Sequence, residues 1–294
     1  MPPDSISRFL FRGNASGIGA RLRRPVDTTW KVQGASSLPT IGGVSESSVS
    51  WAEFQKSRDY KQLGDFRDYI RFDSVHTEAR GDFVDQQAAL AMTFGKAEEG
   101  KIATQTTVVS TVTGLVLANR LKIASASAGL VADYPKPRQQ PPIRPRGNAI
   151  EGVSIDGHEL AVELNEKVFA EKATLRDLIS AYERDDAFYR KHRRHFVETG
   201  AATGTSLKRR APLARGYIYC TVVSRIRWVG DPHPDAKIGN NVVTVPEFGR
   251  IYFGELLISE YARRLSMLRI KLGSPEGGDL CMSEVETNGS TWPD

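Results

Sequence analysis

A short segment, Asp231-Pro232-His233-Pro234-Asp235, places an imidazole between two carboxylates. This grouping could make the imidazole more basic or hold a cation. The two prolines, with Gly239-Asn240-Asn241 downstream, predict a surface loop between strands, which is where functional sites often lie. Asp231, His233 and Asp235 are therefore the first catalytic candidates, for a hydrolase whose site is assembled around this loop. A solvated turn is the simpler interpretation.

A second group of candidate residues is basic. Between residues 190 and 215 only one acid, Glu198, accompanies eight cations: Arg190, Lys191, Arg193, Arg194, Lys208, Arg209, Arg210 and Arg215. Such clusters bind polyanions by releasing condensed counterions. Arg225 and Arg227 add two outward positive charges on the strand predicted at Tyr217–Val229. A nucleic acid or an acidic protein is thus one candidate partner, although a basic helix end followed by an exposed loop explains the same residues.

Other patterns with known chemistry carry less weight. Gly13, Gly17 and Gly19 have a spacing that resembles the cofactor loop of short-chain dehydrogenases, in which a helix follows the glycines. Here Pro25 would end any helix within two turns, and the chain has no Tyr-x-x-x-Lys pair. His192 and His195 lie three apart, but cations surround them and argue against a metal. We expect neither a cofactor nor a metal.

Candidate nucleophiles and paired carboxylates do not form a recognisable catalytic motif either. The chain has no Gly-x-Ser-x-Gly motif, and neither Cys220 nor Cys281 has a histidine near it in sequence. Glu284 and Glu286 are two apart and would share a strand face, as would suit a glycosidase, but acids in such positions normally only solvate a sheet. The sequence favours a non-enzymatic protein.

Composition limits the class of protein. The chain has 294 residues, a net charge of +5 and 40% apolar residues, which is typical of a globular protein with mild positive charge. The apolar run from Thr106 to Asp133 is interrupted by Arg120 and Lys122, so we expect no transmembrane segment. Two cysteines and no secretory leader favour unpaired thiols and a cytoplasmic location.

The elements that would position these residues are mainly strands. Val108, Val112 and Val116 alternate with threonines, which predicts one buried and one exposed face. Similar alternation occurs at Tyr217–Val229 and from Ile251 to the C-terminus. Residues 173–196 have helical spacing, and Thr174 with Asp177 resembles a capping box. We predict a mainly β protein, all-β or α+β, with an antiparallel sandwich or barrel-like sheets of about ten strands and one long helix, 173–196, packed on them.

Residues 135–147 hold five prolines and four basic residues and predict an extended linker or loop. They divide the chain into a β-rich region 1–134 and a β-rich region with a helix, 148–294, which could also form one continuous domain. The leading functional hypothesis is a β-rich binding or assembly protein, with a protein partner or a homo-oligomer. Polyanion binding and hydrolysis are the alternatives.

Overall fold

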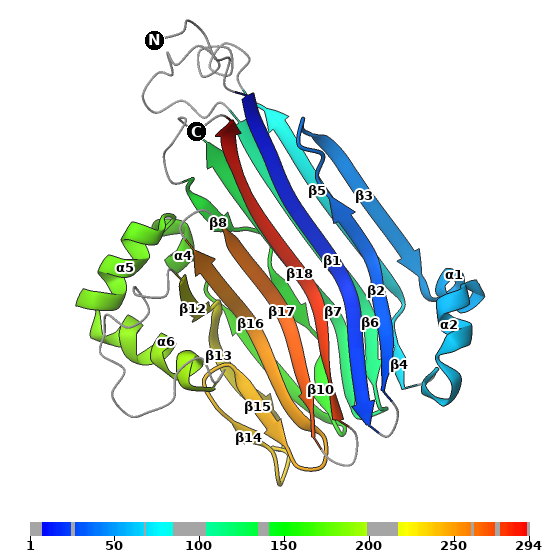
Figure 1. Cartoon of the computed structure of the whole chain (residues 1–294). Helices are drawn as coiled ribbons and strands as arrows, with labels where there is room; N and C mark the ends of the chain where they lie inside the picture. Colours follow the sequence, from blue (N-terminus) through cyan, green and yellow to red (C-terminus); the bar gives the residue numbers. More distant parts are fainter. Residues whose placement is uncertain are drawn as a thin grey trace, which may run out of the picture.

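Two antiparallel sheets pack face to face as an open sandwich (Figure 1). The computed structural model describes residues 8–24, 27–67, 69–84, 104–134, 141–198, 217–259, 262–273 and 277–292. The mainly β prediction is confirmed, and the sheets do not close into a barrel. No helix in the described ranges is long and apolar enough to cross a bilayer.

The front sheet in Figure 1, which we call sheet A, has eight strands. Their order is β14 (Lys237–Ile238), β15 (Val242–Val245), β16 (Gly249–Ser259), β17 (Arg263–Leu272), β18 (Gly277–Trp292), β1 (Arg8–Arg24) and β2 (Thr28–Ser37), and β12 (Tyr217–Thr221) also pairs with β16. The first and last strands of the described chain, β1 and β18, are paired from Arg8 opposite Trp292 to Arg24 opposite Gly277.

The rear sheet, sheet B, has ten strands. Their order is β13 (Val223–Val229), β11 (His158–Leu164), β10 (Val153–Ile155), β7 (Leu121–Tyr134), β6 (Thr104–Leu117), β5 (Ser74–Phe83) and β3 (Gly43–Ser50). β4 (Ile70–Arg71) pairs with β6, and β8 (Ile143–Pro145) and β9 (Ala149–Glu151) pair with β7. Each sheet thus takes strands from both sides of the proline-rich segment. Residues 135–140 of that segment lie outside the described residues.

The helices lie at the two sides of the sandwich (Figure 1). α1 (Trp51–Lys56), α2 (Arg58–Gln62) and a 3-10 turn (Gly64–Phe66) are on one side; α4 (Lys167–Glu171), α5 (Leu175–Arg184) and α6 (Asp186–Glu198) are on the other. The predicted single helix 173–196 is therefore two helices. Asp185 separates them with an extended backbone (φ −101, ψ 106), and its Oδ1 accepts hydrogen bonds from the N–H groups of Ala187 and Phe188. The capping box at Thr174 and Asp177 is confirmed.

Along each long strand, the alternation of core-facing and outward-facing side chains shifts by one residue at one point; we call this shift a reversal of phase. Along most of each strand the side chains that pack between the sheets are two residues apart, as a pleated strand requires, but at one place they are three apart. The pairs are Ala15 and Ile18, Phe253 and Leu256, Leu265 and Leu268, and Met282 and Val285 in sheet A, and Val112 and Leu115, and Ile123 and Ala126 in sheet B. The expectation that Val116 shares the buried face of Val108 and Val112 was wrong: Gly114 (φ +62) reverses the phase, so Leu115 and Leu117 are buried and Val116 is not.

The reversals line up across the strands. In sheet A they fall at Gly34, Gly17, Ser283, Met267 and Gly254, which the pairing registers place side by side and which no registered pair includes. Every second member is left-handed: Gly34 (φ +64), Ser283 (φ +50) and Gly254 (φ +55). We call this row the reversal line. Sheet B has a corresponding row with left-handed Gly114 and Gly152.

Glycine is required on this line for space as well as for backbone conformation. A Cβ on Gly17 would lie 2.0 Å from Val75 Cγ1, and one on Gly254 would lie 2.7 Å from Val222 Cγ2. Ser283 is the exception; its hydroxyl donates to the carbonyl of Ala126 in sheet B at 2.9 Å, which offsets the strain of a left-handed non-glycine residue. Along this line the backbone of sheet A thus packs directly against Val75 and Ala126 of sheet B and against Val222.

We predict that Gly254→Ala destabilises the fold by about 2–4 kcal/mol, the sum of left-handed strain and a close contact with Val222 and Val223. Gly157→Ala is the matched control, because Gly157 is also left-handed (φ +85) but an added Cβ meets nothing within 4 Å. It should cost only about 1 kcal/mol. Urea denaturation of both variants measures the difference. Equal losses would show that close packing at Gly254 is not required.

Candidate functional site

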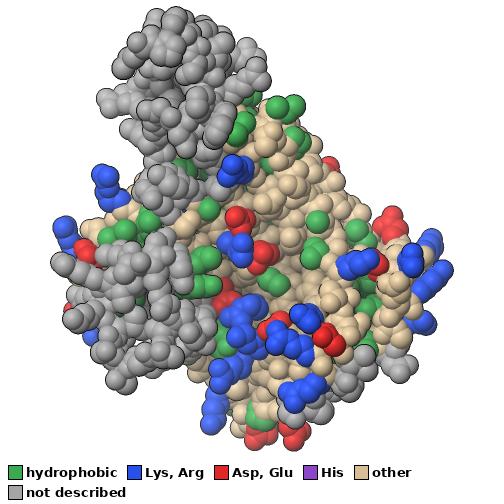
Figure 2. All heavy atoms as spheres, viewed as in Figure 1, with side chains coloured by type: hydrophobic (Ala, Val, Ile, Leu, Met, Phe, Trp, Pro, Cys, Tyr) green, Lys and Arg blue, Asp and Glu red, His purple; other side chains and the backbone are tan. Residues whose placement is uncertain are grey.

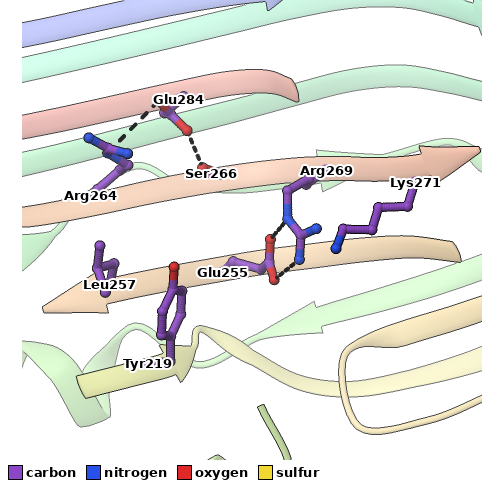
Figure 3. Close-up of a pocket in the computed structure, with 8 residues that line it drawn as sticks. All are labelled: Tyr219, Glu255, Leu257, Arg264, Ser266, Arg269, Lys271 and Glu284. Atoms are coloured by element: carbon purple, nitrogen blue, oxygen red, sulfur yellow. Dashed lines mark hydrogen bonds and ion pairs between the residues drawn. The ribbon is translucent and has the colours of Figure 1, made fainter. Parts of the chain in front are cut away.

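A groove lies on the outer face of sheet A, the face seen in Figure 2, where basic and acidic side chains gather over β16, β17 and β18. It encloses about 290 Å³, near the lower end of the range for small-molecule sites. Side chains from four strands line it: Tyr219, Glu255, Leu257, Arg264, Ser266, Arg269, Lys271 and Glu284 (Figure 3).

The reversal line accounts for the position of the groove. On one side of it Glu255, Ser266 and Glu284 are paired in one outward row; on the other side Tyr252, Arg269 and Cys281 form the next row. These rows are three residues apart along the strands instead of two. At about 3.3 Å per residue, roughly 10 Å separates them, compared with roughly 6.6 Å on a regular strand. Of these two rows, Glu255, Ser266, Glu284 and Arg269 line the groove.

Arg269 crosses the gap between these rows and pairs with Glu255. Its Nε and Nη2 donate to the two carboxylate oxygens at 2.5 and 2.6 Å, and its guanidinium carbon lies 3.9 Å from the centre of the Tyr252 ring. Burial acts to lower the pKa of Arg269, but the hydrogen bonds from Arg269 to Glu255 raise it above the ordinary value. Arg269 is therefore a fixed cation whose Nη1 has no hydrogen-bond partner among the described residues.

The carboxylate of Glu284, the second acid of the groove, is also held by hydrogen bonds. Glu284 Oε2 accepts from the Ser266 hydroxyl at 2.7 Å and from the Cys281 thiol at 3.4 Å. Glu284 Oε1 lies 3.9 Å from Arg264 Nε, which is longer than a hydrogen bond, while Arg264 donates to Glu286 Oε2 at 2.8 Å. Oε1 of Glu284 thus keeps its capacity to accept a hydrogen bond.

Lys271 is a cation of the groove that forms no ion pair with a described acid; Asp279, opposite it on β18, pairs with Arg23 at 3.3 Å. The Lys271 side chain is exposed and extends beside Arg269 (Figure 3). The groove therefore has one end formed by Lys271 and Arg269. The other end holds Ser266, Glu284 and Arg264; Arg264 is paired with Glu286, and Glu284 offers a carboxylate oxygen.

The predicted catalytic loop holds a structural histidine. His233 Nδ1 accepts from the N–H groups of Asp235 and Ala236, both at 3.1 Å, so its Nε2 carries the proton that it donates to Asp156 Oδ2 at 3.1 Å. Both ring nitrogens are therefore engaged, and neither accepts a substrate proton in this arrangement. The side chains of Asp231 and Asp235 are exposed. The hydrolase hypothesis stays a prediction.

Asp156 connects this loop to the rest of the sandwich. Arg120, between β6 and β7, donates Nε and Nη2 to the two oxygens of Asp156 at 2.8 and 2.7 Å, and Nη1 to the carbonyl of Glu247 at 3.1 Å. His158 Nδ1 donates to the carbonyl of Asp231 at 3.1 Å. Turns from both sheets are thus joined around one carboxylate, which we call the Asp156 clamp.

The basic cluster is only partly described. Arg190 is exposed and Lys191 is half-buried on α6, where burial lowers the pKa of Lys191. The side chains of Arg193, Arg194, Lys208, Arg209, Arg210 and Arg215 lie outside the described residues. Arg225 and Arg227 are exposed, as predicted, and Arg227 pairs with Glu163 at 3.2 Å. The single strand predicted at Tyr217–Val229 was wrong, because this range forms β12 in sheet A and β13 in sheet B. Polyanion binding by this cluster stays a prediction.

The groove was not predicted, because alternating residues in a strand were interpreted only as the buried and exposed faces of a sheet. Of the groove residues, the sequence patterns indicated Glu284 alone, as one member of a pair with Glu286. Gly254 gave a usable signal, since a glycine at a change of hydrophobic phase indicates an irregular strand. In the described part of the chain no three side chains of His, Cys, Asp or Glu are grouped so that they could hold a metal ion.

We predict that Asp156→Asn lowers the free energy of unfolding by about 1 kcal/mol at neutral pH, because it removes the charge that pairs with Arg120. Asn tolerates the left-handed backbone of Asp156 (φ +50). Hydrogen bonds from Arg120, and to a lesser degree from His233, lower the pKa of Asp156 despite its partial burial.

The stabilisation by a carboxylate with a lowered pKa is present above about pH 4 and is lost as the pH falls through the lowered value. The gap between wild type and Asp156→Asn should therefore narrow in acid. Urea denaturation as a function of pH measures it, with the exposed Asp235→Asn as control. A gap that stays constant down to pH 2 would contradict a role for the ionised carboxylate.

Comparisons with known proteins give a family and no relative of known function. No curated protein and no solved structure matches the chain. Residues 9–259 match a family described as a domain of unknown function, DUF8256. The match covers every strand of sheet B but ends at the last residue of β16, so β17, β18 and five of the eight groove-lining residues lie outside it. The chain belongs to the DUF8256 family.

Proposed function

We propose that this protein is a non-enzymatic binding protein that holds a small polar ligand in the groove of sheet A. The observation that carries the proposal is the convergence of charged and hydroxyl side chains from four strands on one cavity of about 290 Å³. Backbone pairing of β16, β17 and β18 fixes the two rows of outward residues, so the site is largely formed before a ligand arrives. Such preorganisation lowers the cost of binding.

The state of the groove residues supports binding over catalysis. Both oxygens of Glu255 are engaged by Arg269, and Glu284 already accepts two hydrogen bonds. Burial raises the pKa of the Cys281 thiol, so this sulfur stays protonated and is a weak nucleophile. These groups are placed to orient a ligand and not to exchange protons with it.

Filling the groove tests the proposal. Ser266 points outward between Glu255 and Glu284, so we expect Ser266→Tyr to fold and to occupy the space of a ligand. Ser127→Tyr, a half-buried position on the outer face of sheet B, is the matched control. Wild type and both variants are titrated with a library of polar fragments, and the backbone amide shifts are followed by NMR.

We expect fragment-induced shifts to cluster at Glu255, Ser266 and Glu284 in the wild type and in Ser127→Tyr, and to disappear in Ser266→Tyr. Shifts that are scattered over the surface, or that persist in Ser266→Tyr, would contradict a ligand site in the groove.

A further inference from the structure

The two ends of the groove differ in charge, and this difference indicates the chemistry of its ligand. At one end Lys271 lies beside Arg269, whose Nη1 has no hydrogen-bond partner within the described residues. Arg269 is balanced by Glu255, whereas Lys271 forms no ion pair with a described acid, because Asp279 opposite it on β18 pairs with Arg23 at 3.3 Å. An ammonium and a guanidinium N–H that face the same space favour an anionic group between them.

The other end of the groove suits hydroxyl groups. Glu284 Oε1 can accept a hydrogen bond, and the Ser266 hydroxyl oxygen, which donates to Glu284 Oε2, can accept one from a ligand. Leu257 and the ring of Tyr219 provide an apolar wall next to this end, and the Tyr219 hydroxyl adds a polar group. Closely spaced hydroxyl groups on a compact carbon frame match this lining.

We infer that the groove binds a polyhydroxylated anion, a sugar acid or a sugar phosphate, with its anionic group held by Lys271 and Arg269 and its hydroxyls facing Ser266 and Glu284. This inference rests on the proposed function. It adds a requirement that a generic polar site does not have: the negative charge of the ligand must contribute to affinity through Lys271.

Four probes separate the parts of this inference: sodium glucuronate, glucose 6-phosphate, neutral glucose and cationic glucosamine. Each is titrated into the full chain while the amide signals of Glu255, Ser266 and Glu284 are followed by NMR. We expect glucuronate or glucose 6-phosphate to bind about tenfold more tightly than glucose, because a charge-assisted contact is lost in the neutral sugar. Whichever of the two binds more tightly distinguishes a carboxylate from a phosphate ligand.

The variant Lys271→Gln tests the role of the lysine. It should weaken binding of the preferred anion about tenfold, while Lys271→Arg, which keeps the charge, should retain most of the affinity. Lys122→Gln is the matched control, because Lys122 is also an exposed strand lysine but lies on β7 of sheet B. Lys271 and Lys122 are both exposed, so we expect all three variants to fold.

Three results would overturn the inference. Glucose or glucosamine could bind as tightly as the anions, Lys271→Gln could leave anion affinity unchanged, or none of the four probes could shift the groove amides. The first result would leave the proposed function standing, because a ligand would still occupy the groove. Failure of the proposed function itself would appear separately, as fragment shifts that survive Ser266→Tyr.

Discussion

The arrangement of both sheets depends on a backbone constraint at a few left-handed residues. Gly34, Ser283 and Gly254 turn the pleat of alternate strands in sheet A, and the strands between them follow at Gly17 and Met267. A single reversal would expose apolar side chains, because every later residue of that strand would face the wrong side. The reversals are therefore tolerated only together, in register, and this makes the reversal line a cooperative feature of the sheet.

The groove follows from that constraint. Where buried residues are three apart, outward residues are three apart as well, and the wider gap leaves room on the solvent face. Arg269 spans the gap to Glu255 and stacks on Tyr252, so the wall of the groove is held by one ion pair and one ring contact. Lys271 is then placed beside a cation that is already balanced. Structure and binding chemistry are thus linked through the same few residues of β16 and β17.

Local patterns predicted the class of fold and several elements, but not the site. Alternation in Thr106–Asp133 indicated paired strands, and Thr174 with Asp177 marked the start of a helix, because both signals depend on neighbours in sequence. Asp185 was not recognised as a break, since its role depends on a side-chain cap within a continuous apolar stripe. The groove unites Glu255, Arg269 and Glu284 from three strands, and sequence spacing alone does not report which strands are neighbours or where their phase reverses.

The central claim is that each sheet changes which side chains face the core at one row of residues, and cysteine accessibility along β6 tests it directly for the row of sheet B that contains Gly114. In a background with Cys220 and Cys281 replaced, single cysteines at Thr111, Val112, Leu115 and Val116 are treated with a water-soluble thiol reagent. Reversal at Gly114 predicts modification at Thr111 and Val116 and protection at Val112 and Leu115. Modification at Leu115 with protection at Val116, as in an unbroken alternation, would contradict the account.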